Sequence, residues 1–176
     1  MENFNLPLMS DNISRDDINA VVDFLQQDPI PRLTNGPKVR EFECRWSEWV
    51  GMEYSVMVNS GTAANELTML ALNYISGTGE IIVPPLTWVS DVNSVLFAGH
   101  TPVFVDINLQ NLSFDIEKLK EAITDKTRAI FLTHVLGLNG ITDELIQLCK
   151  EEWFVLMILY FIKYVEHFVL MGWFEK

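Results

Sequence analysis

Short polar and aromatic segments that follow apolar runs hold the residues best suited to chemistry. In residues 58–64 (VNSGTAA) an apolar run ends and a helical pattern starts within three residues. A helix N-terminus offers unpaired N–H groups and a partial positive charge, Gly61 lets the backbone approach an anion closely, and the hydroxyls of Ser60 and Thr62 add donors. This segment fits a phosphate. The alternative interpretation is that Ser60 or Thr62 only caps the helix. Taken alone, the segment favours this helix cap over a phosphate site.

A second segment, residues 83–89 (VPPLTWV), places an aromatic side chain at the start of the next helix. Trp88 would stand at the same sheet edge as Thr62. A flat heteroaromatic cofactor could stack on its indole while the cofactor phosphate binds the neighbouring helix. Taken alone, Trp88 favours the simpler explanation of packing between helix and sheet.

Two further segments have structural explanations. Residues 33–37 (LTNGP) predict a turn that caps a helix. His134 follows an apolar run, and as a lone histidine beside Gly137 it is interpreted as a packed or hydrogen-bonded side chain rather than a catalytic one.

Other cofactor and metal sites find no support in the sequence. It has no G-x-G-x-x-G after a strand, no Walker A lysine, no H-E-x-x-H and no G-x-S-x-G. Cys44 and Cys149 lie far apart without a histidine cluster, so neither a zinc site nor a disulfide framework is predicted.

The elements that position these residues follow from the hydrophobic pattern. Ser14 and Asp17 predict a capped helix whose apolar stripe runs to Leu25, and Pro37 predicts the first turn of another. Beyond them, apolar runs rich in β-formers alternate with helical stretches. Strands are predicted at 54–58, 80–83, 102–105 and 128–133, and helices at about 62–75, 88–98, 115–123 and 142–151. This alternation is typical of an α/β fold with a mainly parallel sheet flanked by helices, whose ligands bind at the carboxyl ends of the strands.

Composition excludes several classes of function. The chain of 176 residues is 49% hydrophobic and carries a net charge of -12, which fits a folded protein and opposes sequence-independent binding to nucleic acid. The first residues lack the pattern of a signal peptide, and a cytoplasmic location is predicted.

Five segments in register resemble the DegT/DnrJ/EryC1/StrS sugar aminotransferases, which are pyridoxal phosphate (PLP) enzymes of the aspartate-aminotransferase fold, type I. They are LTNGPKVREFE, VNSGTAANEL, IIVPPLTWVSDVNSVLFAG, TPVFVDI and AIFLTHVLG, within residues 6–149. The resemblance implies that residues 1–152 form the N-terminal part of the large domain. It also implies a homodimer that moves an amino group from glutamate to a nucleotide-linked keto-sugar, for amino-sugar and polysaccharide biosynthesis.

The resemblance also assigns individual residues. It implies that Gly61, Thr62 and Ala63 hold the cofactor phosphate and that Trp88 stacks on the pyridine ring. The residues implied on the substrate side are Ser60 and the loop formed by Thr34, Asn35 and Gly36.

The sequence departs from the family pattern after residue 152. The family carries an acidic pair at the end of the next strand, whose Asp pairs with the pyridine nitrogen, and then the Schiff-base lysine. Here residues 154–160 read FVLMILY without an Asp, and Lys163 and Lys176 lack the expected surroundings. No catalytic residue is therefore assigned, and covalent attachment of PLP is not expected. We interpret residues 153–176 as a divergent hydrophobic tail, by hypothesis a frameshift product, on a truncated and inactive enzyme.

Two non-catalytic alternatives stay open. Residues 153–174 are long enough for a membrane anchor, although Lys163, Glu166 and His167 near the middle disfavour insertion. The chain could also be a regulatory partner that docks on a complete aminotransferase.

Overall fold

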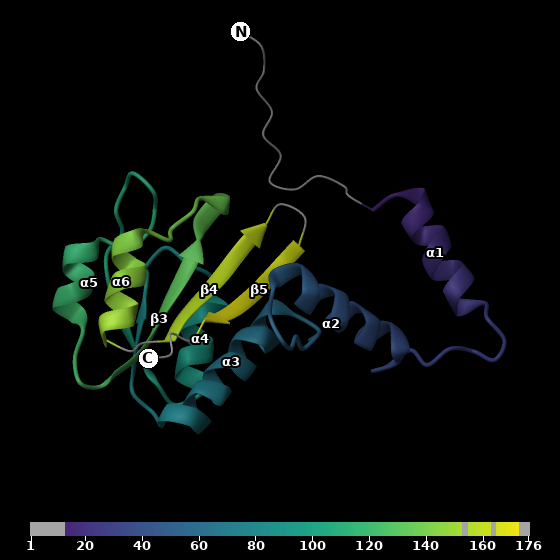
Figure 1. The fold of residues 1–176 in the computed structure, drawn as a ribbon, viewed down its shortest axis with the longest axis horizontal. Helices are drawn as coiled ribbons and strands as arrows, with labels where there is room; N and C mark the ends of the chain where they lie inside the picture. Colours follow the sequence, from purple (N-terminus) through teal and green to yellow (C-terminus); the bar gives the residue numbers. More distant parts are fainter. Residues whose placement is uncertain (1–12, 153–154, 163–164, 173–176) are drawn as a thin grey trace, which may run out of the picture. The chain divides into compact units, whose positions relative to one another are not determined.

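The computed structural model describes residues 13–152, 155–162 and 165–172. Two compact units divide the chain, Met1–Met57 and Val58–Lys176. Figure 1 shows the helices α1 and α2 of the first unit and the sheet and helices of the second. Each unit is described by itself.

The first helix, α1 (Arg15–Leu25), is specified by its cap. The Asp17 N–H donates to the Ser14 hydroxyl at 3.2 Å, and the Ser14 N–H donates to the Asp17 carboxylate at 2.7 Å. This reciprocal capping box satisfies two N–H groups that a helix start would otherwise leave unpaired, and it confirms the predicted helix start. None of the α1 residues is buried, so local capping and periodicity specify this helix without a packed core.

Helix α2 (Pro37–Val50) begins as predicted, with Gly36 as N-cap and Pro37 in the first turn. Gly36 approaches the backbone closely, because a Cβ at this position would lie 2.7 Å from the carbonyl oxygen of Arg32. The helix ends at Gly51, whose φ of 72° is the left-handed conformation that glycine adopts without strain.

The predicted strand at 54–58 is wrong. These residues form no regular secondary structure, and Tyr54 and Val56 are 80% and 77% exposed. The Ser55 hydroxyl instead accepts a hydrogen bond from the Ser47 hydroxyl at 2.8 Å, and the Met57 N–H donates to Glu43 at 2.9 Å. Both partners lie on α2. The run has the composition of a strand, but its polar groups bond to a helix and not to a neighbouring strand.

The second unit is built on a sheet in the order β2-β1-β3-β4-β5. The first four strands in this order are parallel, and β5 pairs antiparallel with β4. Three predicted strands are confirmed within one or two residues, and their carboxyl ends share one edge of the sheet. The strands are β1 (Glu80–Val83), β2 (Thr101–Phe104), β3 (Thr127–His134), β4 (Val155–Ile162) and β5 (Val165–Gly172).

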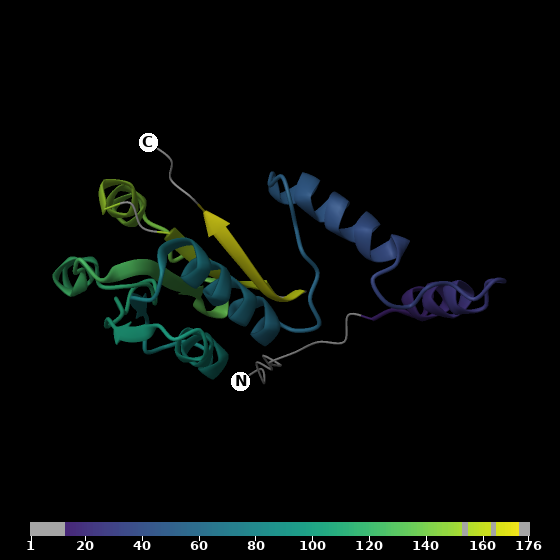
Figure 2. The same ribbon diagram turned by 90° about the horizontal axis from the view of Figure 1, so that it is seen from below.

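Four helices cover the two faces of this sheet and confirm the predicted α/β fold (Figure 2). They are α3 (Gly61–Ser76), α4 (Val89–Phe97), α5 (Ile116–Ala122) and α6 (Asp143–Glu152). Alternate strand residues feed two cores: Ile82 and Ile130 pack with α5 and α6, whereas Ile81, Val83 and Phe131 pack with α3 and α4. Each fully buried large apolar side chain contributes about 1.5–3 kcal/mol, so burial on both faces fixes the sheet and thereby its carboxyl edge.

The apolar segment after residue 152 continues the sheet. Strand β4 pairs with β3 in a register that joins Ala129 to Val155 and His134 to Tyr160, and β5 returns beside β4. A helical membrane anchor is therefore wrong for the strands of this segment. No helix within the described ranges is long and apolar enough to cross a bilayer. Lys163 and Lys176 lie outside the described residues.

Candidate functional site

The start of α3 combines a helix cap with open backbone donors. Ser60 is the N-cap, and its hydroxyl accepts the Ala63 N–H at 3.1 Å while its carbonyl accepts the Ala64 N–H at 3.1 Å. The capping interpretation of the sequence thus holds for Ser60. A helix leaves its first four N–H groups without helical partners, and among the described residues no acceptor bonds the N–H groups of Gly61 and Thr62, so these two can bind an anion. Gly61 is buried and Thr62 is exposed.

Trp88 stands at the start of the neighbouring helix. It is the N-cap of α4, and its carbonyl oxygen accepts the Asp91 N–H at 3.0 Å. The side chain is 48% exposed, so packing between helix and sheet does not cover the whole indole. A partly exposed indole beside a helix N-terminus can stack on a flat ligand.

A buried polar cluster joins these two helix starts to the end of β3. The Asn65 side-chain amide donates to Asp91 Oδ1 at 2.8 Å, across from α3 to α4. Asp91 Oδ2 accepts from the hydroxyl of Thr87 and, at 3.3 Å, from that of Thr133, and the two threonine hydroxyls lie 2.6 Å apart. Asn65 and Asp91 are 0% and 1% exposed. The cluster links three elements at the carboxyl edge of the sheet.

The electrostatics of the cluster follow from its burial. Burial raises the pKa of Asp91 because it disfavours the charged carboxylate, and hydrogen bonds from Thr87 and Thr133 oppose that rise. Asn65 Oδ1 has no hydrogen-bond partner among the described residues. A buried amide oxygen with an open acceptor site is one place where a ligand or water can donate.

His134 is confirmed as a hydrogen-bonded side chain at the end of β3. Its Nδ1 accepts the Gly140 N–H at 2.9 Å and lies 3.1 Å from the carbonyl oxygen of Leu138. Burial lowers its pKa, and the contact with Leu138 opposes that shift. A neutral ring fits this arrangement, since Nδ1 must keep its lone pair to accept from Gly140.

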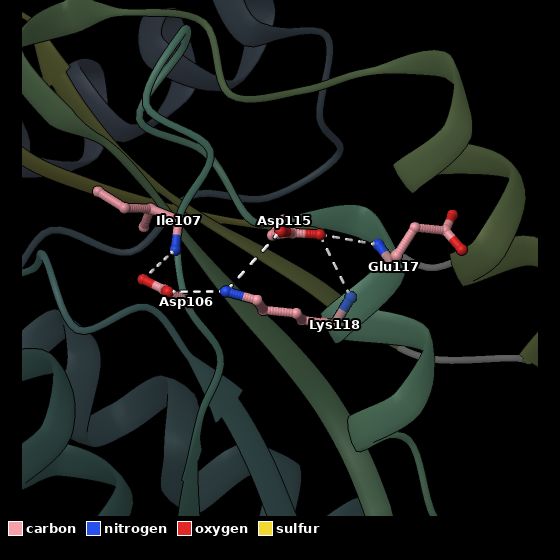
Figure 3. Close-up of polar contacts among 5 residues, drawn as sticks. All are labelled: Asp106, Ile107, Asp115, Glu117 and Lys118. Carbon is pink, nitrogen blue, oxygen red and sulfur yellow. Dashed lines mark hydrogen bonds and ion pairs between the residues drawn. The ribbon is translucent and has the colours of Figure 1, made fainter.

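A cluster of charged residues joins the loop after β2 to the start of α5 (Figure 3). Lys118 donates to Asp106 at 2.8 Å, and the Asp115 carboxylate caps α5 by accepting the N–H groups of Glu117 and Lys118. The bond to Asp106 raises the pKa of Lys118, so this amine stays protonated.

The other predicted residues fall in different places. Thr34, Asn35 and Gly36 form the turn before α2 in the first unit, with Thr34 O accepting from Arg32 at 2.9 Å. Their place on the substrate side stays a prediction. Within the described residues, no group of three or more His, Cys, Asp or Glu side chains could hold a metal.

Sequence reasoning missed Asn65, Thr87, Asp91 and Thr133. The available signal was Asp91 itself, the one acidic residue of the helix that follows Trp88, on its first turn. Nothing in the sequence indicated its partners, because they come from α3 and β3.

Comparisons with known proteins match most of the chain. A family model for the DegT/DnrJ/EryC1/StrS aminotransferase family matches residues 11–158. A UDP-4-amino-4-deoxy-L-arabinose--oxoglutarate aminotransferase of Shewanella sediminis is 38% identical over 137 residues, covering 78% of this chain and 34% of the relative. The spore coat polysaccharide biosynthesis protein SpsC of Bacillus subtilis is 34% identical over 149 residues, covering 85% of this chain and 36% of SpsC.

A solved structure gives the fold and the cofactor. The E. coli GDP-4-keto-6-deoxy-D-mannose-3-dehydratase with bound hydrated PLP superposes with a TM-score of 0.78 at 32% identity, covering 88% of this chain and 40% of that one. PLP is therefore the family cofactor. The chain spans 32–37% of the length of five curated relatives that it matches.

Proposed function

The chain belongs to the DegT/DnrJ/EryC1/StrS aminotransferase family, and we propose that it forms the phosphate-binding side of a PLP site for chemistry on nucleotide-linked keto-sugars. The reaction we propose is transfer of an amino group from glutamate, as the name of the Shewanella relative indicates for that protein. A GDP-sugar dehydratase among the similar structures shows that the same fold also hosts elimination chemistry.

The observation that carries the proposal is the pairing of two helix starts at one sheet edge. The N–H groups of Gly61 and Thr62, with the Thr62 hydroxyl, would hold the phosphate. Ala63, implied as a third phosphate contact, has its N–H bonded to Ser60. The half-exposed indole of Trp88 would stack on the ring. PLP, when bound, supplies an electron sink for bonds at the amino-bearing carbon.

The remaining site residues are proposed on the resemblance. Ser60 and the Thr34, Asn35 and Gly36 turn would face the nucleotide-linked sugar, and a second copy of the chain would complete the site as in a homodimer. Ser60 lies directly beside the open donors of α3, which supports its place at the site.

We further propose that the 176-residue chain by itself does not transaminate. Strand β4, where the resemblance places the acidic partner of the pyridine nitrogen, reads VLMILYFI and contains no carboxylate or lysine. A carboxylate at that position would hold the proton on the ring nitrogen of bound PLP, and β4 supplies none. Docking on a complete aminotransferase stays the alternative role.

Ligand binding tests the proposal directly. Equilibrium dialysis should show that the chain binds PLP more tightly than pyridoxal, which lacks the phosphate, and that inorganic phosphate competes. Equal affinity for PLP and pyridoxal would contradict a phosphate site at α3.

The same samples test inactivity. Borohydride reduction followed by peptide mapping should give only scattered, substoichiometric lysine labelling, and glutamate with a nucleotide-linked keto-sugar should give no amino-sugar. One stoichiometrically modified lysine, or turnover, would overturn this part of the proposal.

A further inference from the structure

We propose that Asp91 is a positioning residue that ties the start of α3 to the start of α4 and thereby sets the spacing between the phosphate donors and the Trp88 indole. The inference rests on the proposed function, because that spacing matters only if one ligand contacts both helix starts.

The contacts of Asp91 define this role. One carboxylate oxygen takes the Asn65 amide of α3 at 2.8 Å, and the other takes the hydroxyl of Thr133 on β3 at 3.3 Å and that of Thr87 before α4. Asp91 thus joins two helices and a strand through a single side chain. Because α3, α4 and β3 are each packed in the sheet unit, the bonds of this one carboxylate fix the distance between the start of α3 and the start of α4.

The partners of Asp91 lie within one helical turn of the residues proposed to contact the ligand. Asn65 lies one helical turn after Gly61, and side chains four residues apart share a helix face. On α4, the Asp91 N–H donates to the carbonyl oxygen of Trp88 at 3.0 Å. A shift of the Asp91 side chain would therefore move Gly61 through Asn65 and would move Trp88 through the backbone.

Burial separates a positioning role from direct contact. Asp91 is 1% exposed, and both carboxylate oxygens already accept bonds from protein groups. Asp91 therefore acts on a ligand through its protein partners and not by direct contact. Buried polar clusters whose members bond one another hold a single geometry better than apolar contacts of the same area.

Two ligands distinguish positioning from a general structural role. Inorganic phosphate needs only the α3 terminus, whereas PLP needs that terminus and Trp88 at the correct spacing. In the full chain, Asp91→Ala should weaken PLP binding about tenfold, equivalent to about 1.4 kcal/mol. Its affinity for inorganic phosphate should stay within about twofold of the parent chain, since a twofold change is only a few tenths of a kcal/mol.

A second variant and a matched control protect the test against misfolding. Asn65→Leu breaks only the tie to α3 and should show the same selective loss of PLP affinity. Asp91→Ala combined with Asn65→Leu should lose no more than Asp91→Ala alone, because removing Asp91 already breaks its bond to Asn65. Ser113→Ala removes a buried 2.6 Å hydrogen bond to Gly140, which involves no member of the Asp91 cluster, and should leave both affinities unchanged.

The possible results distinguish failure of the proposed PLP-binding function from failure of the positioning role of Asp91. If the parent chain does not bind PLP, the proposed function fails, and the positioning role fails with it. If the parent chain binds PLP and both single variants bind it equally well, only the positioning role is overturned. Equal losses for PLP and inorganic phosphate, or additive losses in the double variant, would also overturn it.

Discussion

Replacing Thr62 by valine tests the phosphate site with little disturbance of the fold. Thr62 is exposed on the first turn of α3, and within the described part of the chain no group bonds its hydroxyl. Valine keeps the branched shape and has a similar helix propensity. The free energy of unfolding should therefore change by no more than about 0.5 kcal/mol.

The effect on ligand binding should be much larger than the effect on stability. A hydrogen bond from a hydroxyl to a charged phosphate contributes about 1.5–3 kcal/mol, because the acceptor is ionised. Losing it should weaken PLP binding by a factor of roughly 10 to 150. Isothermal titration calorimetry of the two proteins with PLP measures this difference, and affinity for pyridoxal should not change.

Ser60→Ala is the matched control, because it removes the neighbouring hydroxyl that caps the helix. Loss of the bond to the Ala63 N–H should cost about 0.5–2 kcal/mol of stability. The two variants should thus separate, with Thr62→Val losing affinity and Ser60→Ala losing stability. Equal PLP affinity in the parent chain and Thr62→Val would refute the assignment and leave Thr62 as a first-turn residue without a ligand role.

Three further outcomes concern stability. Gly79→Ala should destabilise the chain by about 1–3 kcal/mol in urea unfolding, because its Cβ would approach the Lys126 carbonyl oxygen and the Arg128 side chain closer than contact distance; an unchanged midpoint would contradict this packing. His134 has a pKa lowered below its ordinary 6.5, so the unfolded chain takes up its proton first and stability should fall as pH drops below 6.5; His134→Gln should remove that component of the pH profile. Asp91 has a pKa raised above 3.8, so the folded chain keeps its proton to higher pH and its contribution to stability should decline as pH rises above 3.8; a profile unchanged in Asp91→Asn would show that the carboxyl does not titrate differently in the folded chain.

Local signals in the sequence located most elements of the fold. Ser14 with Asp17 and Gly36 with Pro37 mark helix starts through contacts between residues at most four apart, and such contacts can be read from a short window. The apolar runs that became β1 and β3 were recognisable because both faces of a parallel strand are buried. The run at 54–58 has the same composition, yet its hydrogen bonds go to α2. A composition typical of strands shows that a segment could fit into a sheet. It does not show that another strand lies beside the segment to pair with it.

The sequence by itself determined the two helix starts near Gly61 and Trp88, because capping and strand-to-helix transitions depend on adjacent residues. Only the tertiary structure decided what holds these starts together. Asp91 meets Asn65 across 26 residues and Thr133 across 42, and these contacts exist because parallel strands bring their carboxyl ends to one edge of the sheet. The hydrophobic periodicity of the sequence does not reveal these contacts, since each partner is an ordinary polar residue within its own helix or strand. Burial then makes the cluster specific, because a carboxylate removed from water must find its donors among the groups that the fold places around it.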